Sequence, residues 1–228
     1  MSLDSFFNWW AGNERLIALL VDALGQTLAM VFASGLVGFI FGIPLGVLLH
    51  LTKKSGLLEN QSVNKILGII VNIGRSIPFI ILLVAIIPFT RFIVGSSIGT
   101  AAAIVPLTIA AIPFIARLVE GALLEVPSGL VEAAQAMGAK PKQIILKVLL
   151  PEALPGIINA VTITLVTLVG YSAMAGTVGG GGLGDVGIRY GYQRFDGTVM
   201  MITVIILVIL VQIIQSLGDH LVKHVDHR

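Results

Sequence analysis

The chain has 228 residues, of which 56% are hydrophobic and 11% are charged, and its formal net charge is +2. An ordinary soluble domain carries roughly 25% charged residues, so this composition excludes a soluble globular protein with a polar surface. The sequence contains no cysteine, which excludes disulfide bonds, thiolate nucleophiles and cysteine metal sites.

Continuous apolar runs of about 20 residues recur along the chain and predict an all-α, polytopic membrane protein. A β-barrel would instead show alternating segments of about 10 residues. Five transmembrane helices are predicted, at residues 23–51, 66–88, 98–116, 153–178 and 198–217. None of these segments contains Asp or Glu, and residues 1–228 are predicted to form a single transmembrane domain.

The residues before the first span are expected to be retained in the mature protein. Only Asp4 is charged before Glu14, so the basic start of a cleaved signal peptide is missing. Four aromatic residues of this segment are expected to lie in the membrane interface: Phe6, Phe7, Trp9 and Trp10.

The first span carries a glycine stripe. Gly38, Gly42 and Gly46 recur at four-residue spacing, so one helix face has no side chains and a second helix can approach it closely. Membrane helices are also generally rich in glycine, and that interpretation stays open. Pro44 lies inside the stripe and is expected to kink the helix.

Arg75 and its neighbour Ser76 lie about ten residues into the second span, near the bilayer midplane at a rise of 1.5 Å per residue. A charge at this depth costs at least about 2.5 kcal/mol, so Arg75 is expected to face protein or water. Two interpretations stay open. Arg75 stabilises a dimer or lines a transport pathway, or it binds carbonyl groups that Pro78 frees one turn later.

The least hydrophobic interior stretch, residues 117–152, is predicted to form two short helices. Ser128 is expected to cap the first helix, and Gly138 is expected to end it in a left-handed conformation. Leu130, Ala133, Ala134 and Met137 follow the spacing of a single apolar face, whereas Glu132 and Gln135 point elsewhere.

The second short helix is predicted to start with Pro141 as its first helical residue and to stop before Pro151. Its apolar residues are expected to face the bilayer or the bundle: Ile144, Ile145, Val148 and Leu149. By periodicity alone, both helices would serve only to brace the bundle.

Polar and sulfur-containing side chains in the fourth span are candidates for lining a transport route for an amino acid. They are Tyr171, Ser172 and Met174. Methionine more often fills gaps in a core, and this alternative stays open.

A glycine-rich run follows the fourth span, and it is interpreted as a pliable outer loop near a receptor or an outer gate. Its candidate residues are Gly180, Gly181, Gly182 and Gly184; a plain flexible connector is the alternative. The run also satisfies G-x-G-x-x-G from Gly179 and from Gly182. A dinucleotide site is excluded because the run follows a membrane helix rather than a strand.

No ATPase or metal site is predicted on this chain. The sequence lacks G-x-x-x-x-G-K-[ST], and Asp185 stands where the lysine would have to be. His220, His224 and His227 share one helical face near Asp226, but a solvated basic tail is the preferred interpretation over a metal cluster. No set of nucleophile, base and orienting group is found either.

The positions of Lys and Arg predict the orientation, because basic loops stay cytoplasmic. One set of loops contains Lys53, Lys54, Lys65, Arg117, Lys140, Lys142, Lys147, Lys223 and Arg228; the opposite set contains Arg15, Arg91, Arg189 and Arg194. The first set is predicted to be cytoplasmic. The N-terminus is therefore expected outside, and residues 117–152 and the C-terminus inside.

The segment 117–152 resembles the EAA loop of ABC importer permeases. The residues that carry the resemblance are Glu132, Ala133, Ala134, Gly138, Leu150 and Pro151, with Val148 in place of the family's Ile. In that family a coupling helix inserts into a cleft of the ATPase. The resemblance implies that Leu130, Glu132, Ala133, Ala134, Ala136, Met137 and Gly138 couple this chain to an ATPase.

The resemblance extends from about Gly25 to Leu217, and four strings are similar to the permease of methionine importers: NIGRSIPFIILLV, VPLTIAAIPFIAR, KVLLPEALPGIINA and TLVGYSAMAGTVGGGGLG. It implies a type I ABC importer permease fold in the bacterial inner membrane, as a homodimer of five-helix subunits. It also implies two copies of an ATPase, and these subunits would bind ATP and Mg and carry a methionine-sensing C-terminal domain. A further implied partner is an extracytoplasmic methionine-binding lipoprotein. This chain itself would carry no cofactor.

Three alternatives remain at this stage. An ABC permease for another amino acid or small polar solute would share every feature above. An ion-coupled secondary transporter usually shows internal repeats and intramembrane acids, which the predicted spans lack. A structural membrane scaffold would show no dependence on ATP.

Overall fold

The computed structural model describes residues 14–226, and within this range the chain is helical and contains no strand. The helices are α2 (Glu14–Thr52), α3 (Gln61–Ser76), α4 (Phe79–Ala85), α5 (Ile87–Val94), α6 (Thr100–Leu124), α7 (Ser128–Ala136), α8 (Pro141–Ile144), the π-helix η1 (Ile145–Leu149), α9 (Leu150–Glu152), α10 (Leu154–Gly176), α11 (Gly182–Val186), the π-helix η2 (Gly187–Tyr192) and α12 (Gly197–Val225). The predicted aromatic interface residues Phe6, Phe7, Trp9 and Trp10 lie outside the described residues.

Four helices, α2, α6, α10 and α12, are long and apolar enough to cross a membrane, and α3 with α4 makes a fifth span if this bent pair counts as one. The predicted second span, residues 66–88, is therefore broken and is not one continuous helix. The pair is bent by 98°. The break lies at Ile77 and Pro78, because the residue before a proline is driven out of the helical region, and Ile77 has φ −82° and ψ 120°.

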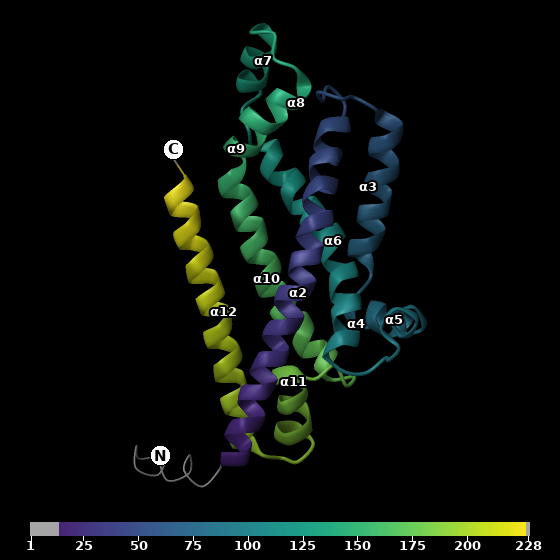
Figure 1. Ribbon diagram of the computed structural model, residues 1–228, viewed down its shortest axis with the longest axis vertical. Coiled ribbons are helices and arrows are strands. Elements are labelled where there is room, and N and C mark those ends of the chain that lie inside the picture. The colour runs from purple at the N-terminus through teal and green to yellow at the C-terminus, as the bar shows by residue number, and fades with distance from the viewer. Residues whose placement is uncertain (1–13, 227–228) are drawn as a thin grey trace.

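The long helices run side by side along the molecule, as Figure 1 shows. The helices α7 and α8 form one end, together with the turn between α2 and α3, and the described C-terminal end of α12 points the same way. The short helix α11 lies at the opposite end, next to the start of α2. The two predicted sets of loops thus lie towards opposite ends of the molecule, although the second span is broken.

Helices α2 and α6 pack through the predicted glycine stripe, which confirms that the stripe is a packing surface. Gly38, Gly42 and Gly46 are all buried. A Cβ atom on Gly42 would lie 2.7 Å from the Cβ of Ile115, and one on Gly46 would lie 2.5 Å from the carbonyl oxygen of Ala116. Only glycine permits this approach. The helix α2 continues through Pro44 as a single element.

The main hydrophobic core joins α2, α6 and α10, with Met30, Leu107 and Leu168 among its fully buried side chains. Helix α6 runs two turns beyond its predicted end, so Arg117 and Glu120 lie inside it and form an ion pair of 2.6 Å. The predicted 117–152 segment therefore begins within a spanning helix.

Candidate functional site

Helix α7 forms the tip of the molecule at the end opposite α11 (Figure 1). Ser128 is its first helical residue and makes no side-chain capping bond, so the prediction that Ser128 is the N-cap was wrong. Pro127 occupies that position, with φ −58° and ψ 127°. Gly138 ends the helix with φ +75°, as predicted, and the N–H of Ala139 donates to the carbonyl of Ala134 over 3.0 Å.

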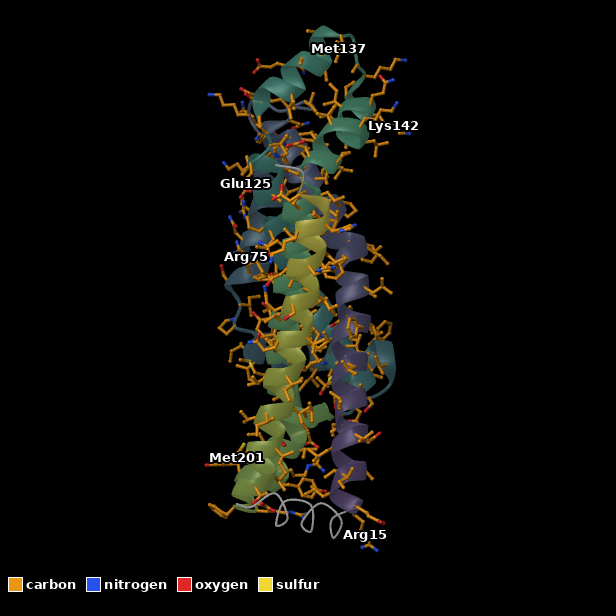
Figure 2. The ribbon with its side chains drawn as sticks, turned by 90° about the vertical axis from the view of Figure 1, so that its left-hand side faces the viewer. Arg15, Arg75, Glu125, Met137, Lys142 and Met201 are labelled. Atoms are coloured by element: carbon orange, nitrogen blue, oxygen red, sulfur yellow. The ribbon has the colours of Figure 1, made fainter. Side chains whose placement is uncertain are left out.

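The apolar residues that were predicted to share one face of α7 differ in their burial. Ala134 is buried in the main core, but Leu130 is 42% exposed and Met137 is 81% exposed, and Ala133 is exposed as well. Figure 2 shows Met137 at the tip. Among residues 14–226, the helix packs through the side that bears Val131 and Ala134, because α8 and η1 return along that side. Leu130, Ala133 and Met137 therefore form an exposed apolar surface on α7, with Glu132 and Ala136 beside it.

The return from α7 to α10 is a nearly continuous helical path through α8, η1 and α9. Pro141 is the first helical residue, as predicted, and the Gln143 side chain accepts a hydrogen bond from the Lys140 N–H over 2.8 Å. The predicted stop before Pro151 was wrong, because a π-helical turn carries the chain on to Glu152. Pro151 has no N–H and cannot donate the usual helical hydrogen bond, and the wider π-helical turn accommodates the missing bond.

The apolar residues predicted to face the bundle from this return path do so. Ile144 and Leu149 are buried, and Ile145 and Val148 are partly buried against the main core. The core is therefore continuous from the membrane helices into the tip of the molecule.

A cleft of about 440 Å³ separates α7 from the turn between α2 and α3. Glu132 and Gln135 line it from α7, and Lys53 lines it from the turn. In the same turn, Glu59 accepts hydrogen bonds from the Gln61 side chain and the Ser55 N–H, and these bonds lower the pKa of its carboxyl group. The turn that faces α7 is thus held in shape by its own side chains.

The candidate pathway residues lie on α3 and α10, and α4, which follows the break at Pro78, contacts α10. The ring of Phe79, the first residue of α4, stacks on Tyr171 of α10 with centroids 4.5 Å apart. Met174 is 45% exposed. Ser172 is buried, and its hydroxyl donates to the carbonyl of Val169 within its own helix over 2.7 Å.

Arg75 and Ser76 are exposed at the end of α3. The Ser76 hydroxyl donates to the Asn72 carbonyl over 2.8 Å. Among residues 14–226, Arg75 has no hydrogen-bond or ion-pair partner, so it does not bind the carbonyl groups near Pro78.

Only residues 177–181 of the glycine-rich segment form a loop. Gly182 begins α11, and helical structure continues through η2 to Tyr192. Gly180, Gly182 and Gly184 are buried, and a Cβ on Gly184 would overlap the Ala173 backbone. Gly181 and Gly182 have φ of +79° and +77°, a conformation that favours glycine. These glycines serve close packing and turn geometry.

Two side chains of α2 bind the start of α11. The N–H of Gly182 donates to Gln26 Oε1 over 2.8 Å, and the N–H of Leu183 donates to Thr27 Oγ1 over 2.9 Å. Sequence reasoning missed both residues, because nothing local connects positions that are 156 residues apart.

A Thr27→Val substitution is expected to lower the free energy of unfolding by about 1–3 kcal/mol, because it leaves the buried Leu183 N–H without an acceptor. Thermal unfolding of the detergent-solubilised protein measures this change. Thr108→Val is the matched control, since the Thr108 hydroxyl donates only to the Ile104 carbonyl of its own helix. Equal effects of the two substitutions would contradict the role of Thr27.

Near the C-terminus, the rings of His220 and His224 lie 6.5 Å apart. Within residues 14–226 no three His, Asp or Glu side chains are grouped so as to hold a metal ion, and His227 lies outside this range.

Comparison with known proteins gives consistent matches. The family described as "Binding-protein-dependent transport system inner membrane component" matches residues 38–228. The chain is 68% identical over 228 residues, 100% of both chains, to a "Probable D-methionine transport system permease protein MetI" of Vibrio cholerae. It is 62% identical over 164 residues to the "D-methionine transport system permease protein MetI" of Escherichia coli, covering 72% of this chain and 76% of that one.

Solved structures agree with these matches. A chain described under "Inward facing conformations of the MetNI methionine ABC transporter: CY5 native crystal form" aligns with a TM-score of 0.93 at 59% identity, covering 94% of this chain and 100% of that one. A chain from "Crystal structure of an amino acid ABC transporter with histidines" aligns with a TM-score of 0.77 at 16% identity, covering 98% and 99%, and shows a shared fold alone.

Proposed function

The chain belongs to the family of binding-protein-dependent transport system inner membrane components, and on that premise we propose that it is the membrane-spanning permease of an ATP-driven methionine importer. The relatives from Vibrio cholerae and Escherichia coli are both described as D-methionine transport permeases, and they support methionine as the cargo. The chain is a transport subunit and not an enzyme. ATP and Mg²⁺ would bind to a separate ATPase.

The open surface of α7 is the observation that carries this proposal. Leu130, Ala133 and Met137 are apolar and exposed at the tip, outside the bundle. An apolar helix face of small side chains fits closely into a groove of another protein. The ATPase would supply that groove, with Glu132 and Ala136 at the edges of the contact.

Movement at α7 would reach the membrane through a rigid connection. Ala134, Ile144 and Leu149 belong to the same packed core as α6 and α10. Packed cores transmit displacement because they are close-packed and resist compression. A displacement of α7 by the ATPase would therefore shift α6 and α10, and such shifts would switch the permease between inward- and outward-facing states.

The proposed orientation places α7 and the C-terminal end in the cytoplasm and the N-terminus outside, in the bacterial inner membrane. The predicted cytoplasmic residues Lys53, Lys140 and Lys142 belong to the segments at the α7 end of the molecule (Figure 1). Two copies of the chain would assemble with two ATPase subunits, and an extracytoplasmic methionine-binding lipoprotein would deliver the cargo at the α11 end.

Tyr171 and Met174 are proposed to border the route of the cargo. Met174 is exposed on α10, and Tyr171 fixes the start of α4 through its stack on Phe79. Ser172 would support this part of α10 from within, because its hydroxyl is satisfied by the Val169 carbonyl. Gly180, Gly181, Gly182 and Gly184 would shape a rigid outer closure beside the lipoprotein.

Uptake into liposomes that contain the permease and its ATPase tests the proposal. Methionine delivered with its binding protein is expected to accumulate only when ATP is hydrolysed, and omission of the ATPase is expected to abolish uptake. Competition by other amino acids then identifies the cargo. Uptake driven by an ion gradient in liposomes without the ATPase would refute the importer assignment.

A further inference from the structure

Helix α3 presents two different exposed faces. One face is apolar and carries Ile66, Ile69, Ile70 and Ile73, whose exposed fractions are 59%, 49%, 58% and 59%. Arg75 lies on another face, about 160° around the helix axis from Ile73 at 100° per residue. The isoleucine face is suited to lipid. The face that bears Arg75 is polar.

Lipid is an unsuitable environment for the face that bears Arg75. A charge in the hydrocarbon region is costly, and charged residues in membrane helices therefore face protein or water. Helix α3 also ends there, at Ser76, so its last carbonyl groups lack partners within the helix. Broken backbone at membrane depth is tolerated only against protein or a water-filled cavity. Both features point to a polar environment beside Arg75.

A polar surface continues from Arg75 towards the α7 end. Asn72, one turn earlier on α3, accepts a hydrogen bond from Arg117 of α6 over 2.5 Å, and Arg117 pairs with Glu120. Beyond them, a cavity of about 240 Å³ is lined by Arg117, Glu125 and Asn159. Figure 2 shows Arg75 and Glu125 on the same side of the molecule, with Glu125 nearer the tip. This surface leads from the middle of the bundle to the end proposed to be cytoplasmic.

The two arginines on this surface differ in their bonding. The guanidinium of Arg117 is engaged by Glu120 and Asn72. Arg75 has no such partner among the described residues. A guanidinium group presents paired N–H donors that match the two oxygens of a carboxylate. Arg75 is therefore the group on this surface that is free to bind an anionic ligand.

We infer that Arg75 binds the carboxylate of the amino-acid cargo during its passage through the permease, an assignment that rests on the proposed function. Arg75 is thus a specificity-determining residue for substrates that carry a free carboxylate.

Uptake by the reconstituted complex of permease, ATPase and binding protein tests this assignment. Arg75→Gln is expected to lower ATP-driven methionine uptake by at least about tenfold, the effect of losing a charged hydrogen bond. Arg75→Lys, which keeps the charge, is expected to recover part of the rate. Lys65→Gln makes the same charge change on an exposed site of α3 and is expected to leave uptake unchanged.

Basal ATP hydrolysis and copurification with the ATPase separate substrate binding from a structural role. Both are expected to stay at the wild-type level in Arg75→Gln. The inference is overturned if uptake by this variant stays within about twofold of wild type, or if assembly and basal hydrolysis fall together with uptake. Absence of methionine uptake by the wild-type complex would instead refute the proposed cargo.

A second measurement does not depend on the identity of the cargo. Since the chain has no cysteine, single cysteines report only their own environment. A charged, water-soluble thiol reagent is expected to modify Arg75→Cys at least about tenfold faster than Ile73→Cys, because only the first position faces water. Equal rates at the two positions would overturn the inference.

Discussion

An Ala133→Trp permease is expected to fold and to reach the membrane but to lose ATP-driven uptake. Ala133 is exposed, so the indole ring does not have to enter the described core. In the assembled transporter, the same ring would occupy the space in which the ATPase contacts α7. Overpacking of a close contact costs about 1–3 kcal/mol, which corresponds to about a 5- to 150-fold loss of affinity. Copurification of the ATPase and the rate of methionine uptake measure the effect.

Two further variants show whether the effect comes from the α7 surface. Lys54→Trp places the same ring on an exposed residue at the same end of the molecule, outside α7, and is expected to leave uptake close to wild type. Ala134→Trp is expected to destabilise the protein itself, because Ala134 is only 4% exposed. Full uptake by Ala133→Trp would show that α7 does not contact the ATPase.

A Gly46→Leu substitution is expected to prevent stable folding. Its Cβ would lie 2.5 Å from the Ala116 carbonyl oxygen and 2.8 Å from the Cβ of Val119, so α2 and α6 would have to separate. Separation of these helices disrupts the main core, and the expected loss is about 3 kcal/mol or more. Yield after membrane extraction and the midpoint of thermal unfolding measure this loss.

The control for this substitution lies in the same helix. Gly25→Leu introduces the same side chain at an exposed position where a Cβ meets nothing within 4 Å. Because leucine favours helix more than glycine does, this variant is expected to be as stable as wild type or more stable. If both variants unfold at the same temperature, the glycine stripe does not hold α2 and α6 together.

The spanning helices and the glycine stripe could be predicted from the sequence because both depend on local length and spacing. The break at Pro78 was missed because a proline inside an apolar run produces either a kink or a full turn, and neighbouring helices decide between them. On α7, spacing correctly selected the apolar residues. Spacing could not predict that Ala134 is buried and Met137 exposed, because this depends on the side of α7 along which α8 and η1 pack.

Composition was misleading for the glycine-rich segment. Many glycines in sequence are typical of a flexible connector, but here Gly182 and Gly184 pack directly against other parts of the backbone and side chains. That role becomes visible only when the partners from α2 and α10 are in place. For Arg75 the reverse holds. The cost of a charge near the bilayer midplane already excluded contact between Arg75 and lipid. The structure adds the exposed isoleucine face of α3, which lipid can contact instead.

The bonds from Gln26 and Thr27 to the start of α11 impose an order on biosynthesis. Chains generally begin to fold from the N-terminus while synthesis continues, so α2 leaves the ribosome with both acceptors long before α11 exists. The two N–H groups of Gly182 and Leu183 find their acceptors only after the intervening helices have entered the bilayer. This contact can therefore close only after the whole chain from α2 to α11 has been made.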